Sequence, residues 1–360
     1  MDGNNLKGQV NYIISIVVPC YNCENTLDGT IESLTNQKVR MKNNTCDYQI
    51  VLVDDGSKDT TPAKCDDYMR SNSHIKALHK SNGGLVSAWK AGVNAADGKY
   101  IAFCDSDDYI DSDFVDRMQN AIKNYDPDII VFGMMTEYSN GEKVCNDIIL
   151  EAGNYDRSQI RKDLFPKLLS DGDMQSELVG SSRCNKIFTK RLLQKIMVDI
   201  PDDISFGEDD LTCFAALLNA ESMYAIRGYF PYHYVRNNES MIGAYDPYTF
   251  DKIGKVYRGL SEISEKYAYS YPNQVKKEIL SILFLFMKKE ICKNPGSYWN
   301  VKGKLIQILE SDAYRECFSE STIKGYGTTK RLFANLLNRR LFFVVYAFAK
   351  VAEGIRGRNV

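Results

Sequence analysis

The sequence has no strong excess of charge, no long apolar run and no secretory signal. Its 360 residues carry a net charge of −2, so no surplus of basic side chains indicates nucleic-acid binding. The uninterrupted apolar run Leu341–Ala349 is too short to span a bilayer, and the first ten residues, Met1–Val10, are polar. Hydrophobic residues make up 44% and charged residues 26% of the chain, which is typical of a globular protein.

The cysteines also give no sign of a disulfide framework. Ten are scattered along the chain, and several lie inside apolar runs, where cysteine acts as a small hydrophobic residue. The only paired spacing is Cys20-x-x-Cys23, and without a second pair it is a weak signal for zinc. Together with the polar N-terminus, this pattern predicts a reducing, cytoplasmic compartment.

The most informative segment that is present is Lys99–Asp108, an apolar strand that runs directly into several carboxylates. Asp105, Asp107 and Asp108 lie so close in sequence that they cannot all stay ionised in a buried site without a cation. An Asp-x-Asp pair at a strand end suits a hard divalent ion, which commonly holds phosphate oxygens as well. The segment therefore predicts Mn²⁺ or Mg²⁺ bridging a nucleotide diphosphate. A turn of Asp and Ser that simply closes the strand is the alternative.

The same pattern of a buried strand followed by a polar turn occurs twice earlier. Ile14–Val18 ends at the turn 19–22, and Ile50–Val53 ends at the turn 54–57. Helices are predicted over 24–37, 62–70 and 85–96, and a further strand over 76–79. Strands that alternate with helices predict an open, mostly parallel sheet with helices on both faces. Ligands of such sheets bind at the carboxyl ends of the strands, where all three polar turns would meet.

These turns resemble the successive motifs of family 2 glycosyltransferases. The segments that carry the resemblance are Ile14–Gln37, Val51–Ser57, Ser81–Gly84, Tyr100–Tyr109, Ser181–Phe188 and Phe206–Leu211. The resemblance covers roughly residues 11–240 and implies a GT-A, Rossmann-like fold and inverting transfer of a sugar from a nucleotide donor. Trp89-Lys90 stands where the family often has Arg-Asn, so no polar contact is carried over to that helix.

The resemblance assigns roles around the donor. Asp107 and Asp105 correspond to the metal-binding pair. Seven residues correspond to nucleotide-binding positions: Pro19, Tyr21, Asp55, Gly83, Gly84, Asp105 and Ser106. A carboxylate at Asp55 suits the imide N–H of uracil, so the predicted donor is a UDP-sugar. The two glycines would let the backbone approach the diphosphate, although a simple turn between strand and helix is the alternative.

Inverting transfer also needs a general base that takes the proton of the acceptor hydroxyl. The resemblance points to Asp209, with Glu208 next to it as the second candidate and Asp210 as a further one. Three acidic residues at a helix start are also favoured by the helix dipole, which is the structural alternative.

Four further residues are weaker candidates for framing the donor or acceptor pocket: Asn185, Lys186, His233 and Arg236. His233 or Arg236 could reach the diphosphate or its metal. Each of the four is equally consistent with an ordinary strand position.

The chain changes character after residue 245. We expect a glycosyltransferase domain over 11–240, a helical module over 245–327 and a basic amphipathic helix over 328–360. Helices are predicted over 248–267, 274–292 and 301–309. The last segment carries seven Lys and Arg against a single Glu353, with apolar residues at helical spacing. This composition suits a membrane interface, and it also suits a helix that docks on its own domain or a homodimer contact.

The sequence therefore predicts a hexosyl- or N-acetylhexosaminyl-transferase of surface-polysaccharide synthesis, such as capsule or exopolysaccharide. Its acceptor would be a lipid-linked glycan or oligosaccharide, and the enzyme would lie on the cytoplasmic face of the plasma membrane. A catalytically silent nucleotide-sugar-binding module would have lost the Asp-x-Asp or Glu-Asp residues, and both are present. A sugar nucleotidyltransferase would have a Gly-rich loop with Arg and Lys after the first strand, which Pro19–Glu24 lacks.

Overall fold

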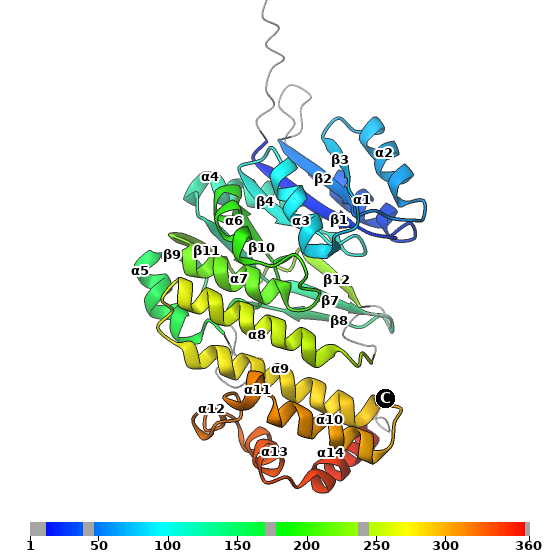
Figure 1. The fold of residues 1–360 in the computed structure, drawn as a ribbon. Helices are drawn as coiled ribbons and strands as arrows, with labels where there is room; N and C mark the ends of the chain where they lie inside the picture. Colours follow the sequence, from blue (N-terminus) through cyan, green and yellow to red (C-terminus); the bar gives the residue numbers. More distant parts are fainter. Residues whose placement is uncertain (1–11, 39–46, 170–177, 237–244, 357–360) are drawn as a thin grey trace, which may run out of the picture. The chain divides into compact units, whose positions relative to one another are not determined.

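The computed structural model describes residues 12–38, 47–169, 178–236 and 245–356 (Figure 1). Contacts divide the chain into two compact units. Unit 1 comprises Met1–Ile160, Val179–Ser205 and Ala215–Asn238. Unit 2 comprises Arg161–Leu178, Phe206–Phe214 and Glu239–Val360.

Unit 1 is built around an eight-stranded sheet with the order β3-β2-β1-β4-β10-β6-β11-β9. Its strands are β1 (Ile14–Cys20), β2 (Tyr48–Asp54), β3 (Ile75–His79), β4 (Tyr100–Phe103), β6 (Ile129–Phe132), β9 (Gly153–Asp156), β10 (Lys186–Thr189) and β11 (Ser222–Ile226). The neighbours β3, β2, β1 and β4 are all parallel. Only β10 and β9 run against their partners. The predicted open, mostly parallel sheet is therefore confirmed.

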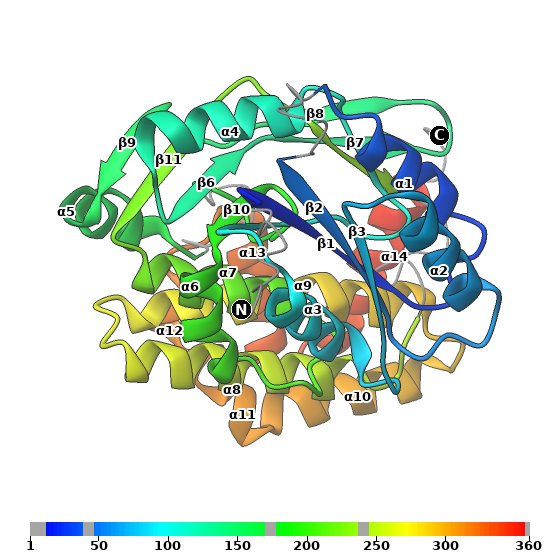
Figure 2. The ribbon, with the colours of Figure 1, turned by 90° about the horizontal axis from the view of Figure 1, so that it is seen from above.

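The central strands are buried along their whole length, which is typical of a sheet covered on both faces. Its helices are α1 (Leu27–Thr35), α2 (Thr61–Ser71), α3 (Gly84–Ala95), α4 (Phe114–Tyr125), the short α5 (Arg157–Gln159) and α6 (Lys190–Ile196), followed by a 3-10 turn, Met197–Asp199. Figure 2 shows α4 on one face of the sheet and α3 and α6 on the other. Helix α3 lies so close to β1 that a Cβ on Gly92 would come within 2.3 Å of the Val17 side chain.

Helix α1 begins at Leu27 rather than at residue 24, for a local reason. The backbone N–H of Cys23 donates to the Thr61 hydroxyl (2.9 Å), and that of Glu24 donates to the Asp59 carboxylate (3.1 Å). These bonds hold the chain in a turn that joins the ends of β1 and β2 before the helix can start.

A second sheet of four strands has the order β5-β12-β7-β8. Its strands are β5 (Tyr109–Ile110), β7 (Met134–Tyr138), β8 (Lys143–Asn146) and β12 (Tyr232–Arg236). Strand β12 is parallel to β7 and antiparallel to β5. The sequence did not predict this sheet, because β5 has only two residues and the pairing of β12 with β7 joins segments almost 100 residues apart.

Unit 2 is helical, as predicted for the C-terminal part. Its helices are α8 (Thr249–Lys266), α9 (Pro272–Lys293), α10 (Tyr298–Glu310), α11 (Asp312–Arg315), α12 (Glu320–Ile323), α13 (Thr328–Asn338) and α14 (Phe342–Arg356), with a π-helical turn (Ile160–Leu164) and a 3-10 turn (Phe165–Lys167) before them. Within the described residues, no helix is long and apolar enough to cross a membrane.

The prediction of a single helix over 328–360 is wrong, because α13 stops at Asn338 and a second helix, α14, begins at Phe342. The N–H of Leu341 donates to the carbonyl of Leu336, and that of Arg340 donates to the carbonyl of Leu337, both at 2.9 Å. Arg340 itself is left-handed, with φ +60°. This is the Schellman arrangement that ends a helix, and it turns the chain before α14 begins. Residues 357–360 lie outside the described part.

Candidate active site

The carboxyl ends of β1 and β2 are tied together by their turns. Asn22 accepts from the N–H of Lys58 (2.8 Å) through its side chain and donates its own N–H to the Ser57 hydroxyl (3.0 Å). It adopts a left-handed conformation, φ +49°, which asparagine tolerates well. Next to it the Tyr21 side chain is 50% exposed, while Pro19 is buried in β1. The turn therefore presents an aromatic ring at the surface of the sheet edge.

Asp55 organises the glycine loop that precedes α3. Its buried carboxylate accepts from the ammonium of Lys80 (2.6 Å) and from the backbone N–H groups of Gly83 (3.0 Å) and Gly84 (2.8 Å). Gly84 has φ +85°, a conformation that suits glycine. The structure thus brings Asp55, Gly83 and Gly84 together and gives Asp55 a structural role that the sequence did not reveal.

The four residues Asp105–Asp108 follow β4, the strand beside β1, and their three carboxylates differ in environment. Asp105 lies 3.4 Å from the guanidinium of Arg183, which is itself buried. Asp107 is exposed and lines a groove of about 380 Å³ together with residues of α1. Asp108 is buried and accepts from the Tyr232 hydroxyl (2.5 Å) and the N–H of Val235 (2.8 Å). The first two side chains border the sheet edge, and the third joins β4 to the second sheet.

The electrostatics of this turn are those of crowded carboxylates. Burial, with the nearby charges of Asp105 and Asp107, raises the pKa of Asp108 to about 8. Desolvation by the surrounding protein also raises the pKa of Asp107. Among the described residues, Asp107 forms no ion pair, whereas Asp105 has Arg183. A negative charge is thus disfavoured here unless a cation compensates it.

Asp105 and Asp107 fit a divalent ion such as Mg²⁺, which needs few protein ligands. The described residues contain no group of three or more His, Cys, Asp or Glu side chains arranged to enclose a metal. Mg²⁺ is commonly held by one or two carboxylates together with substrate phosphates and water, so it does not need such a group. Asp107, with Asp105 beside it, supplies oxygen ligands of the right type.

Asn185 and Lys186 support the loop before β10. The ammonium of Lys186 is completely buried and donates to three carbonyls, those of Val179 (3.0 Å), Gly180 (2.8 Å) and Ser182 (2.7 Å). It also contacts the Asn185 side-chain oxygen (2.9 Å), and the Asn185 amide donates to the carbonyl of Phe132. These contacts fold the segment that carries Arg183.

Replacing Lys186 by methionine is expected to lower the free energy of unfolding by about 2 kcal/mol or more, because buried carbonyls lose their donor. Thermal or urea unfolding measures this change. The control is Lys123→Met on the exposed face of α4, for which a change within about 0.5 kcal/mol is expected. A Lys186→Met variant as stable as wild type would show that these contacts contribute little.

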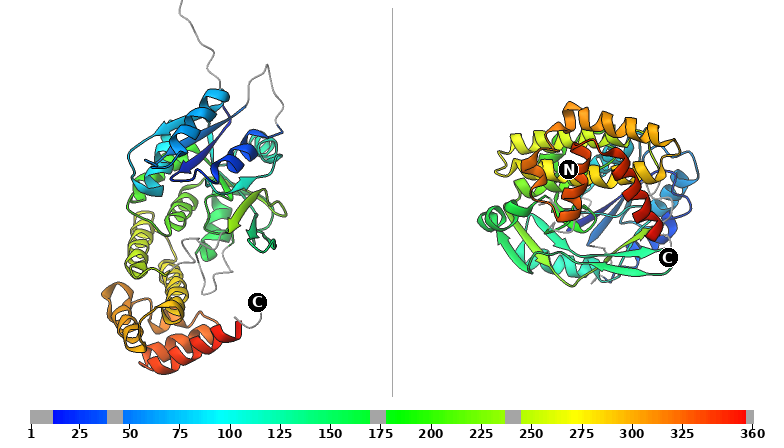
Figure 3. Two further views of the ribbon diagram at one scale, coloured as in Figure 1. Left: turned by 90° about the vertical axis from the view of Figure 1, so that its right-hand side faces the viewer. Right: turned by 90° about the horizontal axis from the view of Figure 1, so that it is seen from below.

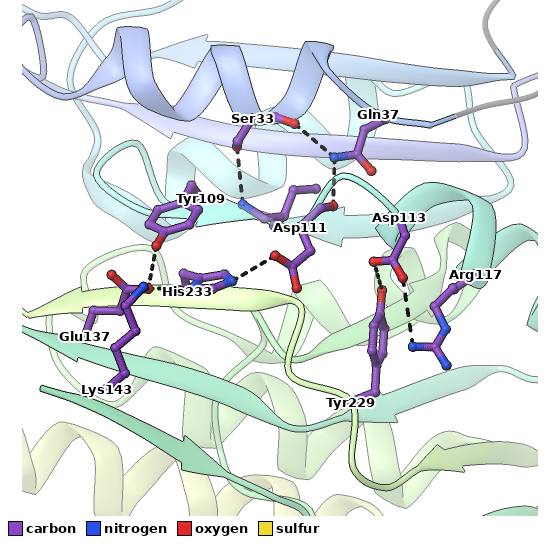
Figure 4. A network of polar contacts seen from close by, with 11 residues as sticks. Ser33, Gln37, Tyr109, Asp111, Asp113, Arg117, Glu137, Lys143, Tyr229 and His233 are labelled. Carbon is purple, nitrogen blue, oxygen red and sulfur yellow. Dashed lines mark hydrogen bonds and ion pairs between the residues drawn. The ribbon is translucent and has the colours of Figure 1, made fainter.

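His233 and Arg236 lie on β12, and Figure 4 shows His233 within a network of polar contacts. The ring of His233 lies between Glu137 (Nδ1 to Oε1, 2.7 Å) and Asp111 (Nε2 to Oδ1, 3.1 Å) and stacks on Tyr109 at 4.3 Å. Arg236 lies over the ring of Tyr138. Both ring nitrogens of His233 are therefore engaged in holding β5, β7 and β12 together.

The Glu-Asp motif opens α7 (Glu208–Asn219), and its first residues belong to unit 2. Gly207, with φ +73°, makes the turn into the helix, and a Cβ there would come within 2.8 Å of Val256 on α8. Leu211 packs against Gly259 of the same helix. Glu208, Asp209 and Asp210 form the acidic first turn and are half-buried. The Glu-Asp motif is therefore grouped with the helices of unit 2. The sequence suggested instead that the helical module begins only after residue 240.

Three residues that contact the candidate site residues were not identified from the sequence: Arg183, Lys80 and Tyr232. Arg183 lies inside a motif that the sequence singled out, but only the fold brings it to Asp105. Lys80 immediately precedes the glycine loop and pairs with Asp55. Tyr232 is fully buried, and its hydroxyl contacts both Asp108 and the N–H of Asp105 (3.2 Å). Of the three, Lys80 could have been found from the sequence, because it is a cation next to a glycine loop.

Several known proteins are similar to this chain in sequence. Residues 15–193 match the family model for Glycosyl transferase family 2. An uncharacterized glycosyltransferase of Bacillus subtilis, EpsJ, is 25% identical over 364 residues, which cover 96% of this chain and 98% of that protein. A poly(ribitol-phosphate) beta-glucosyltransferase of Bacillus spizizenii is 28% identical over 65% of this chain, but the chain covers only 34% of its length.

Solved structures show the same fold. A crystal structure of S. aureus TarS 1-349 in complex with UDP has a TM-score of 0.65 and covers 95% of this chain and 91% of that one, at 18% sequence identity. The chain therefore has the GT-A fold. It carries a family 2 glycosyltransferase domain and is a glycosyltransferase.

Proposed function

We propose that the protein is an inverting, metal-dependent glycosyltransferase that uses a UDP-sugar. One observation carries this proposal: Tyr21, Asp55 and the Asp105–Asp107 turn follow three neighbouring parallel strands, β1, β2 and β4, at one edge of the sheet. Nucleotides bind at this edge in open α/β sheets. The TarS structures with UDP and with UDP-GlcNAc support a uridine donor by analogy of fold.

In this proposal Tyr21 stacks on the base from its exposed position. Asp55 keeps the glycine loop in shape through Gly83 and Gly84. Asp107 and Asp105 hold Mn²⁺ or Mg²⁺. When bound, the ion would neutralise the diphosphate and stabilise charge on the leaving nucleotide. Arg183 keeps the Asp105 side chain in position beside it.

Asp209 is proposed to take the proton from the acceptor hydroxyl as that oxygen attacks the anomeric carbon. Glu208 either orients Asp209 or binds the acceptor. The acidic first turn of α7 is held by Gly207 and Leu211 on α8, so the proposed base rests on a packed helix start rather than on a loop.

The acceptor is proposed to be a hydroxyl of a lipid-linked glycan in polysaccharide biosynthesis. The similarity over almost its full length to EpsJ, and the similarity to a poly(ribitol-phosphate) beta-glucosyltransferase, support a cell-surface polymer as the product. Such an acceptor would bring the enzyme to the cytoplasmic face of the plasma membrane.

Calorimetry with nucleotides tests the donor assignment. In the presence of Mn²⁺, UDP is expected to bind and GDP to bind far more weakly. Tyr21→Ala is expected to weaken UDP binding about tenfold, because stacking of a base on an aromatic ring is worth roughly 1–3 kcal/mol. Tyr248→Ala, at a similarly exposed tyrosine on unit 2, is the control. GDP binding as tight as UDP binding would refute the uridine assignment.

A further inference from the structure

The helix α14 has two apolar faces, and the described residues of unit 2 cover one of them. Phe342, Val345 and Ala349 are buried, and the helix packs on α9. On the opposite side, four apolar residues of the same helix are exposed: Phe343 (70%), Val344 (46%), Phe348 (52%) and Val351 (62%). At 100° per residue these four fall within an arc of about 140°. The helix is therefore docked and still presents a second apolar surface.

A tryptophan from α10 extends this surface. Trp299 is 70% exposed and its ring contacts Tyr298 at 5.2 Å between centroids. Tyr298 in turn contacts Phe343 (6.0 Å) and Tyr346 (5.2 Å) of α14. We call Trp299, Phe343, Val344, Phe348 and Val351 the outer patch. Helices α13 and α14, the last two helices of the described residues, are orange-red to red in Figure 3.

The border of the outer patch is basic. Lys302 lies over the ring of Trp299, and Lys350 lies over the ring of Tyr346. The turn that leads into α14 contributes Arg339 and Arg340, both exposed, with Arg340 also 3.2 Å from Glu310. Apolar and aromatic side chains framed by Lys and Arg are typical of a surface that lies on a membrane with anionic headgroups.

We propose that the outer patch binds the surface of a bilayer containing anionic lipids, with α14 lying in the plane of the interface. This inference rests on the proposed function, because a lipid-linked acceptor would lie in the membrane that the outer patch binds. Charge complementarity decides against a second copy of the chain as the occupant. In a two-fold dimer the same patch meets itself, so the basic border would face its own like charges.

The test uses the full chain and flotation with two kinds of vesicle, phosphatidylcholine alone and phosphatidylcholine mixed with phosphatidylglycerol. Binding is expected only to the second kind, at low salt, and release is expected as NaCl is raised. Phe343→Ser/Phe348→Ser is expected to lower the partition coefficient at least about tenfold. Arg339→Gln/Lys350→Gln, which removes two charges of the basic border, is expected to lower it about fivefold per charge removed. The melting temperature should change little, because all four side chains are exposed.

Matched controls are Val198→Ser and Tyr248→Ser, two exposed apolar positions outside the patch, which should bind vesicles as wild type does. If Phe343→Ser/Phe348→Ser does not fold, Val344→Ser/Val351→Ser tests the same face. Three results would each overturn the proposal: a wild-type chain that ignores phosphatidylglycerol at low salt, patch variants that still bind, or a wild-type dimer that becomes monomeric in the patch variant without vesicle binding.

UDP affinity, measured on the same samples, separates this proposal from the proposed function. Vesicle binding without UDP binding would refute the donor assignment alone. UDP binding without vesicle binding would refute the membrane surface alone.

Discussion

Replacing Asp107 by alanine is expected to reduce sugar transfer at least about 100-fold, because the proposed metal loses its most accessible carboxylate. The side chain is exposed and forms no ion pair within the described residues, so its removal should leave the fold intact. The charge of Asp107 helps to raise the pKa of the buried Asp108, and the change removes that charge. The melting temperature of the variant without metal is therefore expected to equal or exceed that of wild type.

A readout besides activity is the effect of Mn²⁺ on UDP binding. In the wild type, Mn²⁺ should raise the affinity for UDP measured by calorimetry. In Asp107→Ala this Mn²⁺-dependent gain in UDP affinity should be lost. Asp67→Ala, at an exposed aspartate of α2, is the control and should keep the increment. An Asp107→Ala variant that transfers sugar at the wild-type rate, or keeps its Mn²⁺ dependence, would contradict the metal assignment.

Changing Asp209 to asparagine is expected to lower the rate of transfer by roughly 10²–10⁴-fold, the usual contribution of general-base catalysis. The shape of the side chain is kept and only its proton affinity is lost. UDP affinity should hardly change, because the proposed role concerns the acceptor. The loss of one negative charge at a helix start should cost stability only about 0.3–1 kcal/mol.

The matched control is Asp251→Asn, which removes an aspartate from the first turn of α8 and should leave the rate unchanged. Glu208→Gln and Asp210→Asn complete the series and rank the three acidic residues of α7. If Asp209→Asn keeps the rate while one of these loses it, the base is that residue instead.

Much of the site was accessible from the sequence because its residues follow strands that can be recognised locally. Ile14–Cys20 and Tyr48–Asp54 are continuous apolar runs closed by polar turns, and each is buried along its full length. Since the carboxyl ends of neighbouring parallel strands meet, the sequence alone assigns Tyr21, Asp55 and Asp107 to one sheet edge. Helices such as α8 and α9 were predictable from their apolar periodicity.

The partners of those residues could not be predicted in the same way. Asp108 looks like a third member of the acidic cluster, yet its carboxylate binds Tyr232 and Val235, more than 120 residues further along the chain. Lys186 looks like a pocket lysine, yet it is buried among carbonyls of its own loop. His233 is engaged by two carboxylates of the second sheet. Each of these roles depends on which distant segment is brought near.

The sequence by itself determined the parallel strands, their polar turns and the family-specific motifs, because a buried strand and a turn are written into consecutive residues. Only the tertiary structure decided that β10 runs antiparallel between β4 and β6, that Phe206–Phe214 packs with α8 and α9, and that α14 covers one apolar face and leaves the other exposed. The periodicity of a helix shows that an apolar face exists, but which side is covered depends on long-range packing, which no local pattern records.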